Sequence, residues 1–483
     1  MSGSGAAALR RSLPLLAALA IVFASLAVQI VHSGSERTLM GDYRAFYCAA
    51  RVAMHRENPY ASAPLHACEA KPVPPPLFQA KRNEVLPAPL PGYAVAAFMP
   101  FALLPFAFSA AVWAIVSCAA FGMAIRYLWR LKLGSIPLLL AAFALPLAAT
   151  SLPVGELPPI ALAGIALLAW AMTNGRPAAV VAGLALAMCE PQIGIAAAAA
   201  TIVLSRRFAL VTLLTLGGLA LISLLTLGAA ENVQYVRAVL PEHVLAELPR
   251  ASQFSLSWIF DRAGASATVA IGAGRLQYVC GIALAALIAR TKAARETPAL
   301  GIFAAAALAV TGGPFVHLDH IALAMPALLL LALRARAERS LVIAACVALA
   351  VPLLFLVSTP ATLIVVPFIV AWLVAALSEG RDAALRASAI GTLTIAIVLA
   401  VVARYGTGLH ASAIHAGAAA ASETWGAYIR RSDVMDGWAI WLLKIPTWFA
   451  LLTAAALSSL NILPKASAAS SDLYREAARG LAE

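Results

Sequence analysis

The sequence predicts an all-α polytopic membrane protein, and three observations carry this prediction. First, 62% of its 483 residues are hydrophobic, only 12% are charged and the mean hydropathy is +0.89, whereas a soluble chain carries about twice that charge. Second, apolar runs suited to spanning helices recur from end to end, without the alternating pattern of a barrel. Third, Lys and Arg are strung between these runs, so the net charge of +12 reflects topology and excludes nucleic-acid binding.

The predicted spans follow one another along a single integral membrane domain, residues 1–483, and give about 11–14 transmembrane helices. Several are short enough to be half-helices. The first is expected to be an uncleaved span, although its Ser33-Gly34-Ser35 flank leaves a cleaved signal peptide as the alternative. The apolar residues 92–104 favour a re-entrant helix. The predicted spans cover residues 13–31, 107–128, 136–150, 157–173, 178–190, 192–204, 208–228, 268–290, 298–312, 320–334, 341–357, 361–377, 387–403 and 438–458.

The distribution of basic residues predicts the orientation of these spans. Alternate connections carry Lys and Arg, whereas those near residues 151–156, 189–191, 312–319 and 358–360 contain neither. By the positive-inside rule, both termini are cytoplasmic, including the tail 459–483. The long loops 32–91, 229–267 and 404–437 are then extracytoplasmic. We therefore expect a multi-pass protein of the cell inner (plasma) membrane.

The first of these loops contains the stretch GDYRAFYCAARVAMHRENPY at residues 41–60. A helix from Tyr43 to about residue 56 places Arg44, Arg51 and His55 on one face. The rest of its surface is largely apolar and aromatic, which is typical of a helix lying in the membrane interface. Cys48 and Cys68 share this loop, so an oxidising compartment would favour a disulfide and a reducing one two free thiols.

Ionisable residues from four separate segments are predicted to gather on the extracytoplasmic side. Such groups are costly at membrane depth and usually face a functional cavity, so we expect one polar cleft. For the first three residues, the alternative is a simple helix-capping role. The last three also suggest metal ligation, but their spacing fits no compact zinc signature, and an imidazole suits a phosphate equally well. The residues are Asp42, Glu156, Glu190, His317, Asp319 and His320.

A sequence motif in the first loop resembles that of glycosyltransferase family 87, whose members are GT-C-type membrane enzymes and include polyprenol-phosphate-mannose-dependent mannosyltransferases. The motif is D-x-x-x-[FY]-Y-x-A-A…N-P-Y, formed here by Asp42, Phe46, Tyr47, Ala49, Ala50, Asn58, Pro59 and Tyr60. The resemblance continues through Gly155-Glu156, Gly183 to Pro191, Ser255-Leu256, Pro314 and His317/His320.

The resemblance implies a GT-C-like bundle and an inverting transfer of a mannose-like sugar. The sugar would pass from a polyprenyl-phosphate donor to a lipid or glycan acceptor on the extracytoplasmic side, among membrane lipids and with neither cofactor nor metal. Asp42 would be the general base on the acceptor hydroxyl. The leaving phosphate would be stabilised by His317 or His320 together with Arg44 or Arg51. The remaining expected substrate-binding residues are Tyr47, Asn58, Tyr60, Glu156, Glu190 and Asp319.

Two positions depart from the family pattern. Glu190 stands where the family commonly has Lys, and Glu156 where it commonly has Gln. If that Lys binds phosphate, its loss implies an altered donor, another cation in its place, or an inactive GT-C-like relative. A transporter or flippase is a further alternative, but such proteins place their ion sites between inverted repeats near the midplane. Here no repeat is visible and the ionisable residues gather towards one face.

Overall fold

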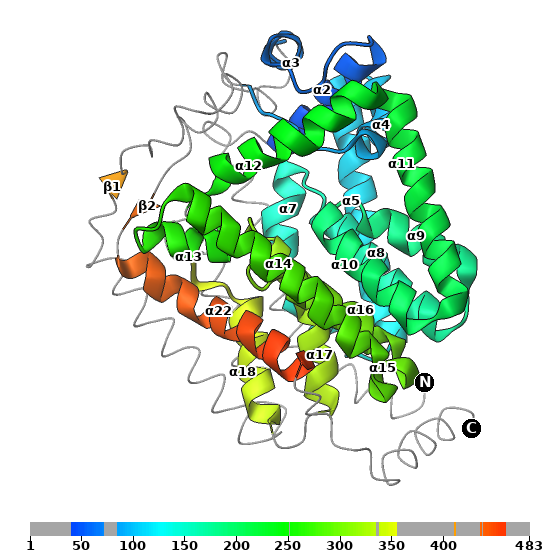
Figure 1. Ribbon diagram of the computed structural model, residues 1–483, viewed down its shortest axis with the longest axis vertical. Helices are drawn as coiled ribbons and strands as arrows, with labels where there is room; N and C mark the ends of the chain where they lie inside the picture. The colour runs from blue at the N-terminus through cyan, green and yellow to red at the C-terminus, as the bar shows by residue number, and fades with distance from the viewer. Residues whose placement is uncertain are drawn as a thin grey trace, which may run out of the picture.

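The computed structural model describes residues 40–71, 85–250, 252–334, 338–354, 410–411, 435–436 and 438–459. The described chain is almost entirely helical, which confirms the predicted all-α polytopic class (Figure 1). An antiparallel pair of two-residue strands, β1 (His410–Ala411) and β2 (Met435–Asp436), is the exception. The spans predicted at 13–31, 361–377 and 387–403 and the tail 459–483 lie largely or wholly outside the described residues.

Five described helical segments are long and apolar enough to cross a membrane, and seven more apolar helices have 10–17 residues. The long segments are Phe106–Arg130, Ile136–Val154, Arg206–Glu247, Ala267–Arg290 and Ile440–Ser459. The third is broken at Gly228, whose φ of 84° is not helical. This break falls at the predicted end of the span 208–228, because glycine adopts a positive φ without the steric cost of a Cβ.

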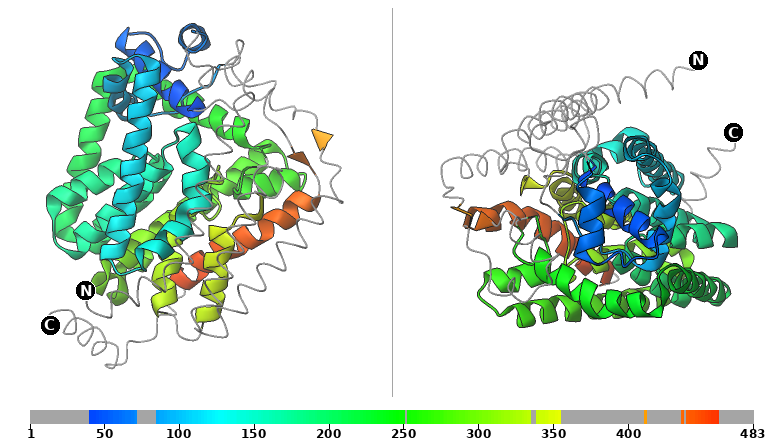
Figure 2. Two further views of the ribbon diagram at one scale, coloured as in Figure 1. Left: turned by 180° about the vertical axis from the view of Figure 1, so that it is seen from behind. Right: turned by 90° about the horizontal axis from the view of Figure 1, so that it is seen from above.

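The N-terminal half of the described chain starts with helices at one end of the molecule, where α2, α3 and α4 lie together (Figures 1 and 2). The helices up to residue 204 are α2 (Gly41–Met54), α3 (Ser62–Glu69), α4 (Gly92–Ala102), α5 (Phe106–Arg130), α6 (Ile136–Phe143), the π-helix η2 (Ala144–Ala148), α7 (Ala149–Val154), α8 (Pro158–Thr173), α9 (Pro177–Ala187) and α10 (Pro191–Leu204).

The second half begins beside these helices and continues to the other end of the molecule (Figure 1). Its helices are α11 (Arg206–Gln234), η3 (Tyr235–Val239), α12 (Leu240–Glu247), α13 (Leu256–Arg262), α14 (Ala267–Arg290), α15 (Lys292–Glu296), α16 (Pro298–Val310), η4 (His320–Ala324), α17 (Met325–Arg334), α18 (Arg339–Ala350) and α22 (Trp438–Ser459). The short α15 lies at the end opposite α2 (Figure 1). Residues 229–267, predicted to be a loop, are in fact largely helical.

Small residues bring the spanning helices into close contact. On α8, a Cβ at Gly164 would lie 2.3 Å from the backbone nitrogen of Ala187 in α9. A reciprocal Cβ at Gly183 would lie 2.7 Å from the backbone nitrogen of Leu168. Close backbone approach at small residues is the usual way for helices to pack in lipid, where the hydrophobic effect does not drive association. This packing positions the short turn between α9 and α10, which carries Glu190.

The helix α2 is buried against the rest of the protein, which differs from the interfacial helix that we expected. Its aromatic residues Tyr43, Phe46 and Tyr47 are all buried. The Tyr43 ring stacks on Trp113 of α5 at a centroid distance of 5.4 Å, and Phe46 packs against Phe98 of α4 at 5.3 Å. Its aromatic surface therefore holds α2 in the protein interior, because burial of large rings inside a packed core is strongly favourable.

Candidate functional site

A cavity of about 950 Å³ lies among the turns that join the helices. Its walls come from α2, the α7–α8 turn, the α9–α10 turn, η3, α12, α14 and residues 314–320. All six ionisable residues expected on one side of the membrane line this cavity: Asp42, Glu156, Glu190, His317, Asp319 and His320. Segments that are far apart in the sequence therefore contribute to one polar site.

The start of α2 is docked on the turn that follows α7. The backbone nitrogen of Met40 donates to the carbonyl of Pro153 at 2.8 Å. Gly155 has a φ of 81°, and a Cβ at this position would lie 2.6 Å from the Cβ of Tyr43. Only glycine therefore permits both this turn and the close approach of α2. The docking brings Asp42, in the first turn of α2, into the cavity.

Three carboxyl groups meet where these segments join. Glu156 makes side-chain hydrogen bonds with both Asp42 and Asp319, and the hydroxyl of Ser151 donates to Asp319 Oδ2 at 3.0 Å. Burial raises the pKa of Glu156 well above its ordinary value, and the two neighbouring carboxylates add to this shift. A carboxylic acid that keeps its proton can donate to a carboxylate. Glu156 is therefore suited to act as the hydrogen-bond donor of the cluster, with its one O–H shared between the two neighbouring carboxylates.

The two partners of Glu156 differ in their own electrostatics. Burial raises the pKa of Asp42, while its hydrogen bond with Glu156 and the nearby Arg250 guanidinium partly offset that rise. At Asp319, burial acts in the same upward direction, but the hydrogen bond from Glu156 and the adjacent His320 outweigh it and lower the pKa. Asp42 is thus the more basic of the two carboxylates, as a proton acceptor requires.

The structure shows no side-chain capping bond from these acids, although Asp42 lies in the first turn of α2. The N-cap of α2 is Met40 and that of α8 is Leu157, and neither helix has a side-chain capping bond. Glu190 occupies the N-cap position of α10, but its side chain makes no capping bond either. The carboxyl groups of Asp42 and Glu156 instead face each other.

On the opposite wall, two imidazoles contact two carboxylates. His320 Nε2 lies 3.1 Å from Glu190 Oε2, and His317 Nε2 lies 3.1 Å from Glu247 Oε2. The remaining ring nitrogen of His320, Nδ1, accepts from the backbone nitrogen of His317 at 3.1 Å. Potential ligand atoms of His317, Asp319 and His320 lie within 4.8 Å of one another. Both ring nitrogens of His320 are engaged, one by Glu190 and the other by the backbone nitrogen of His317, which does not favour metal ligation by this residue. That no metal is needed stays a prediction.

Sequence analysis missed the basic and acidic residues that α12 and the turn after it contribute to the cavity wall. Arg250 Nη1 lies 2.9 and 3.1 Å from the two carboxylate oxygens of Glu247, and His243 lines the same cavity. A signal was present, because His243 and Glu247 are four residues apart and share a face of α12, and Arg250 follows shortly after the end of this helix. A second cation, Arg275 of α14, also lines the cavity and is exposed.

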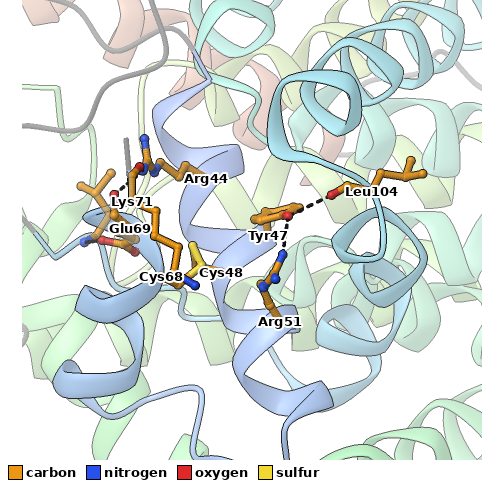
Figure 3. Close-up of a disulfide and its surroundings, with 9 residues drawn as sticks. Arg44, Tyr47, Cys48, Arg51, Cys68, Glu69, Lys71 and Leu104 are labelled. Carbon is orange, nitrogen blue, oxygen red and sulfur yellow. Dashed lines mark hydrogen bonds between the residues drawn. A yellow bond between two sulfur atoms is a disulfide. The ribbon is translucent and has the colours of Figure 1, made fainter. Parts of the chain in front are cut away.

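Five residues of the first loop that were expected to bind substrate do not line the cavity: Arg44, Tyr47, Arg51, Asn58 and Tyr60. Figure 3 shows where three of them lie. The guanidinium of Arg44 donates to the carbonyl oxygens of Glu69 and Lys71. Arg51 donates to the hydroxyl of Tyr47 at 3.0 Å. Arg44 therefore connects α2 with residues around the end of α3, and Arg51 contacts Tyr47 within α2 itself.

The other two residues of this group brace the cavity wall from outside. Asn58 Nδ2 donates to Gln234 Oε1 at 2.8 Å, across a gap of 176 residues in the sequence. The hydroxyl of Tyr60 donates to the carbonyl of Leu90 at 2.7 Å, and its ring stacks on the cavity-lining Tyr235 at 5.9 Å. The Asn-Pro-Tyr motif thus connects the first loop with η3.

A disulfide between Cys48 and Cys68 joins α2 to α3 (Figure 3). The two Cα atoms are 5.7 Å apart. This settles the choice between a disulfide and two free thiols that the sequence left open. Because such bonds persist in oxidising compartments, the pairing also bears on which side of the membrane α2 occupies.

Comparison with known proteins gave one match. Residues 91–318 match the model of glycosyltransferase family 87. No curated protein and no solved structure matches the chain. The matched range includes Glu156, Glu190, Glu247, Arg250 and His317, whereas α2 and α22 lie outside it.

Proposed function

We propose that this protein is a membrane glycosyltransferase, because residues 91–318 match the model of glycosyltransferase family 87. The protein transfers a sugar from a polyprenyl-phosphate donor to a hydroxyl of a lipid or glycan acceptor. Asp42 is the general base. The single observation that carries this proposal is the position of Asp42 inside the cavity, hydrogen-bonded to Glu156.

The proposed step balances as a single displacement. Asp42 takes the proton of the acceptor hydroxyl while its oxygen forms a bond to the anomeric carbon of the donor sugar. The bond between that carbon and the phosphate oxygen breaks, and the polyprenyl phosphate leaves with the bonding electrons. Attack opposite the leaving group inverts the anomeric centre. The raised pKa of Asp42 suits this role, because a more basic carboxylate accepts the proton more readily.

We assign stabilisation of the leaving phosphate to Arg250 and Arg275 in place of Arg44 and Arg51. The first two line the cavity and the last two do not. Cations that face a developing anion within a poorly hydrated cavity are effective electrostatic catalysts. Arg250 and Arg275 would then supply the positive charge of the Lys that the family commonly has where this chain has Glu190.

The cavity wall supports a donor that carries a lipid tail. Two of its lining side chains, Ile195 of α10 and Val236 of η3, are 45% and 62% exposed. In a membrane protein such exposed apolar residues on spanning segments face lipid. We place the polyprenyl tail beside them, with the phosphate near Arg275 and the sugar towards Asp42.

We place the reaction on the extracytoplasmic side of the cell inner membrane, with both termini cytoplasmic. The Cys48–Cys68 disulfide supports an oxidising environment for the end of the molecule that carries α2. The basic α15, with Lys292 and Arg295, lies at the opposite end (Figure 1), as the positive-inside rule favours.

The test uses purified protein in lipid nanodiscs with a panel of polyprenyl-phosphate sugars, beginning with mannose. We expect Asp42→Asn to lose turnover by at least about a hundredfold, since general-base catalysis contributes 10²–10⁴, while its thermal unfolding stays normal. Glu57→Gln is the matched control, because Glu57 is an exposed carboxylate just beyond α2. Equal rates for Asp42→Asn and wild type would refute the base assignment. Substrate uptake into sealed proteoliposomes without covalent product would favour the transporter instead.

A further inference from the structure

Lys444 lies within the apolar helix α22 and its side chain has no exposed surface. Its Nζ is 3.2 Å from the ring centroid of Trp258, and the rings of Phe254 and Trp448 lie 5.3 and 6.0 Å away. Aromatic faces attract a cation. Within the described part of the chain, no carboxylate pairs with this amine. Aromatic rings and one backbone carbonyl therefore surround it.

A basic group in this position is costly. Removing an ammonium from water disfavours its charged form, and an apolar side chain of similar volume would fill the same space without that cost. Ionisable residues inside spanning helices are for this reason usually functional. Lys444 does not line the cavity, so its function must depend on the groups to which it is hydrogen-bonded.

The group that Lys444 holds is the backbone just before α13. Its Nζ donates to the carbonyl of Gln253, and Trp448 Nε1 donates to the next carbonyl, that of Phe254, at 3.2 Å. Lys444 and Trp448 are four residues apart and therefore share one face of α22. Two successive turns of this helix thus fix two successive carbonyl groups.

The same short segment is hydrogen-bonded to Val316, which precedes the cavity-lining His317. Gln253 Oε1 accepts from the backbone nitrogen of Val316 at 2.8 Å, and the backbone nitrogen of Phe254 donates to the carbonyl of Val316 at 2.7 Å. Gln253 Nε2 also donates to Glu247 Oε2 at 3.3 Å. The next residue after Val316 is His317, whose imidazole contacts the same Glu247 oxygen.

We infer that Lys444 is a positioning residue for the proposed transferase site. It fixes Gln253, which in turn fixes Glu247 and the backbone before His317 on the cavity wall. This inference rests on the proposed function for its catalytic consequence. It means that α22, which lies outside the range of the family match, completes the support of the site.

The test compares Lys444→Met with wild type in three measurements on the full-length protein in nanodiscs. We expect turnover to fall at least about tenfold, as when a charge-assisted hydrogen bond is lost. We expect thermal stability to be unchanged or raised, because an apolar group replaces a lone buried amine. Amide hydrogen exchange should quicken in peptides covering residues 252–256 and 312–318, and remain unchanged in those of α5.

Thr447→Val is the matched control. Thr447 is fully buried on the same helix, its hydroxyl has no hydrogen-bond partner in the described structure, and valine has the same shape. We expect this variant to behave as wild type in all three measurements. Gln253→Leu keeps the contact of Lys444 with the carbonyl and breaks only the side-chain links. It should reproduce the loss of turnover, and combining it with Lys444→Met should add little, since the two residues act through one chain of contacts.

Wild-type turnover and exchange in Lys444→Met would overturn the inference, and so would retained turnover in Gln253→Leu. A parallel loss of stability and turnover in Lys444→Met would also overturn it, because that pattern marks a purely structural lysine. The exchange measurement requires no substrate. If the wild-type protein transfers no sugar, the proposed function fails, yet local exchange near residues 252–256 and 312–318 still decides whether Lys444 positions the wall.

Discussion

Replacing Glu156 in two ways separates a protonated acid from an ionised one. Glu156 is hydrogen-bonded to both Asp42 and Asp319, and burial raises its pKa well above the ordinary value. We therefore expect it to hold its proton at neutral pH and to donate. In Glu156→Gln, the uncharged amide has two N–H donors and can contact both carboxylates. In Glu156→Leu, both contacts are lost at similar volume.

The expected magnitudes follow from these contacts. A hydrogen bond to a charged group is worth about 1.5–3 kcal/mol, which corresponds to roughly 10–100-fold in an equilibrium. Without the bond from Glu156, which lowers the pKa of Asp42, burial raises that pKa further. The base is active when ionised, so the acidic limb of the pH profile moves to higher pH. At pH 7 kcat/KM of Glu156→Leu should fall by roughly 10–100-fold, whereas Glu156→Gln should stay within about threefold of wild type.

The assay is the pH dependence of kcat/KM for both variants, with Glu57→Gln as the exposed control. An infrared difference spectrum between wild type and Glu156→Gln gives an independent measurement, because a protonated carboxylic acid has a C=O band that an ionised one lacks. If Glu156→Gln is as slow as Glu156→Leu, then Glu156 works as an ionised carboxylate and the reasoning fails. A wild-type pH profile in Glu156→Leu would equally refute the coupling to Asp42.

Three further predictions concern the surroundings of the site. Burial raises the pKa of Glu69 to about 8 from an ordinary 4.5. The stability that this residue contributes is therefore present below about pH 4.5 and is lost as pH rises through 8. Glu69→Gln should flatten the pH dependence of the thermal unfolding temperature, and an unchanged pH dependence would contradict this. Replacing Cys48 and Cys68 by Ser removes a disulfide whose cysteines are 20 residues apart and should destabilise the protein by about 3 kcal/mol. The measurement is the denaturant midpoint of unfolding with and without reductant. Equal midpoints for the Ser variant and the oxidised wild type would refute this. Because the imidazoles of His317 and His320 contact carboxylates, turnover should survive dialysis against a chelator, and activity restored only by added metal would count against the prediction.

The spans were predictable because the bilayer fixes the length of an apolar helix. The predicted span 107–128 corresponds to α5 (Phe106–Arg130), and 268–290 corresponds to α14 (Ala267–Arg290). The gathering of ionisable residues was also predictable, because the sides of successive connections alternate once the spans are known. The predictions were weakest where the chain leaves the apolar runs, as in residues 229–267.

The roles of the first-loop residues could not be predicted from helical periodicity. The spacing of Arg44 and Arg51 correctly indicates a shared face, but not what that face contacts. Packing decides this, and in the structure Arg44 donates to carbonyl oxygens at and after the end of α3 while Arg51 donates to the hydroxyl of Tyr47. Lys444, by contrast, had a usable signal, since it is a single charge inside a predicted apolar span.

Charge pairing explains how a cavity with so many acids is suited to an anionic phosphate. Glu247 contacts Arg250, and Glu190 contacts His320, so these two carboxylates are paired within the wall. Burial raises the pKa of Glu156 well above its ordinary value, so we expect it to keep its proton and to be the chemical counterpart of the glutamine that the family pattern favours. The positions that depart from that pattern therefore do not add unpaired negative charge beside the donor. In the proposed reaction Asp42 is the proton acceptor, and the leaving phosphate faces Arg275 together with Arg250, which is paired with Glu247.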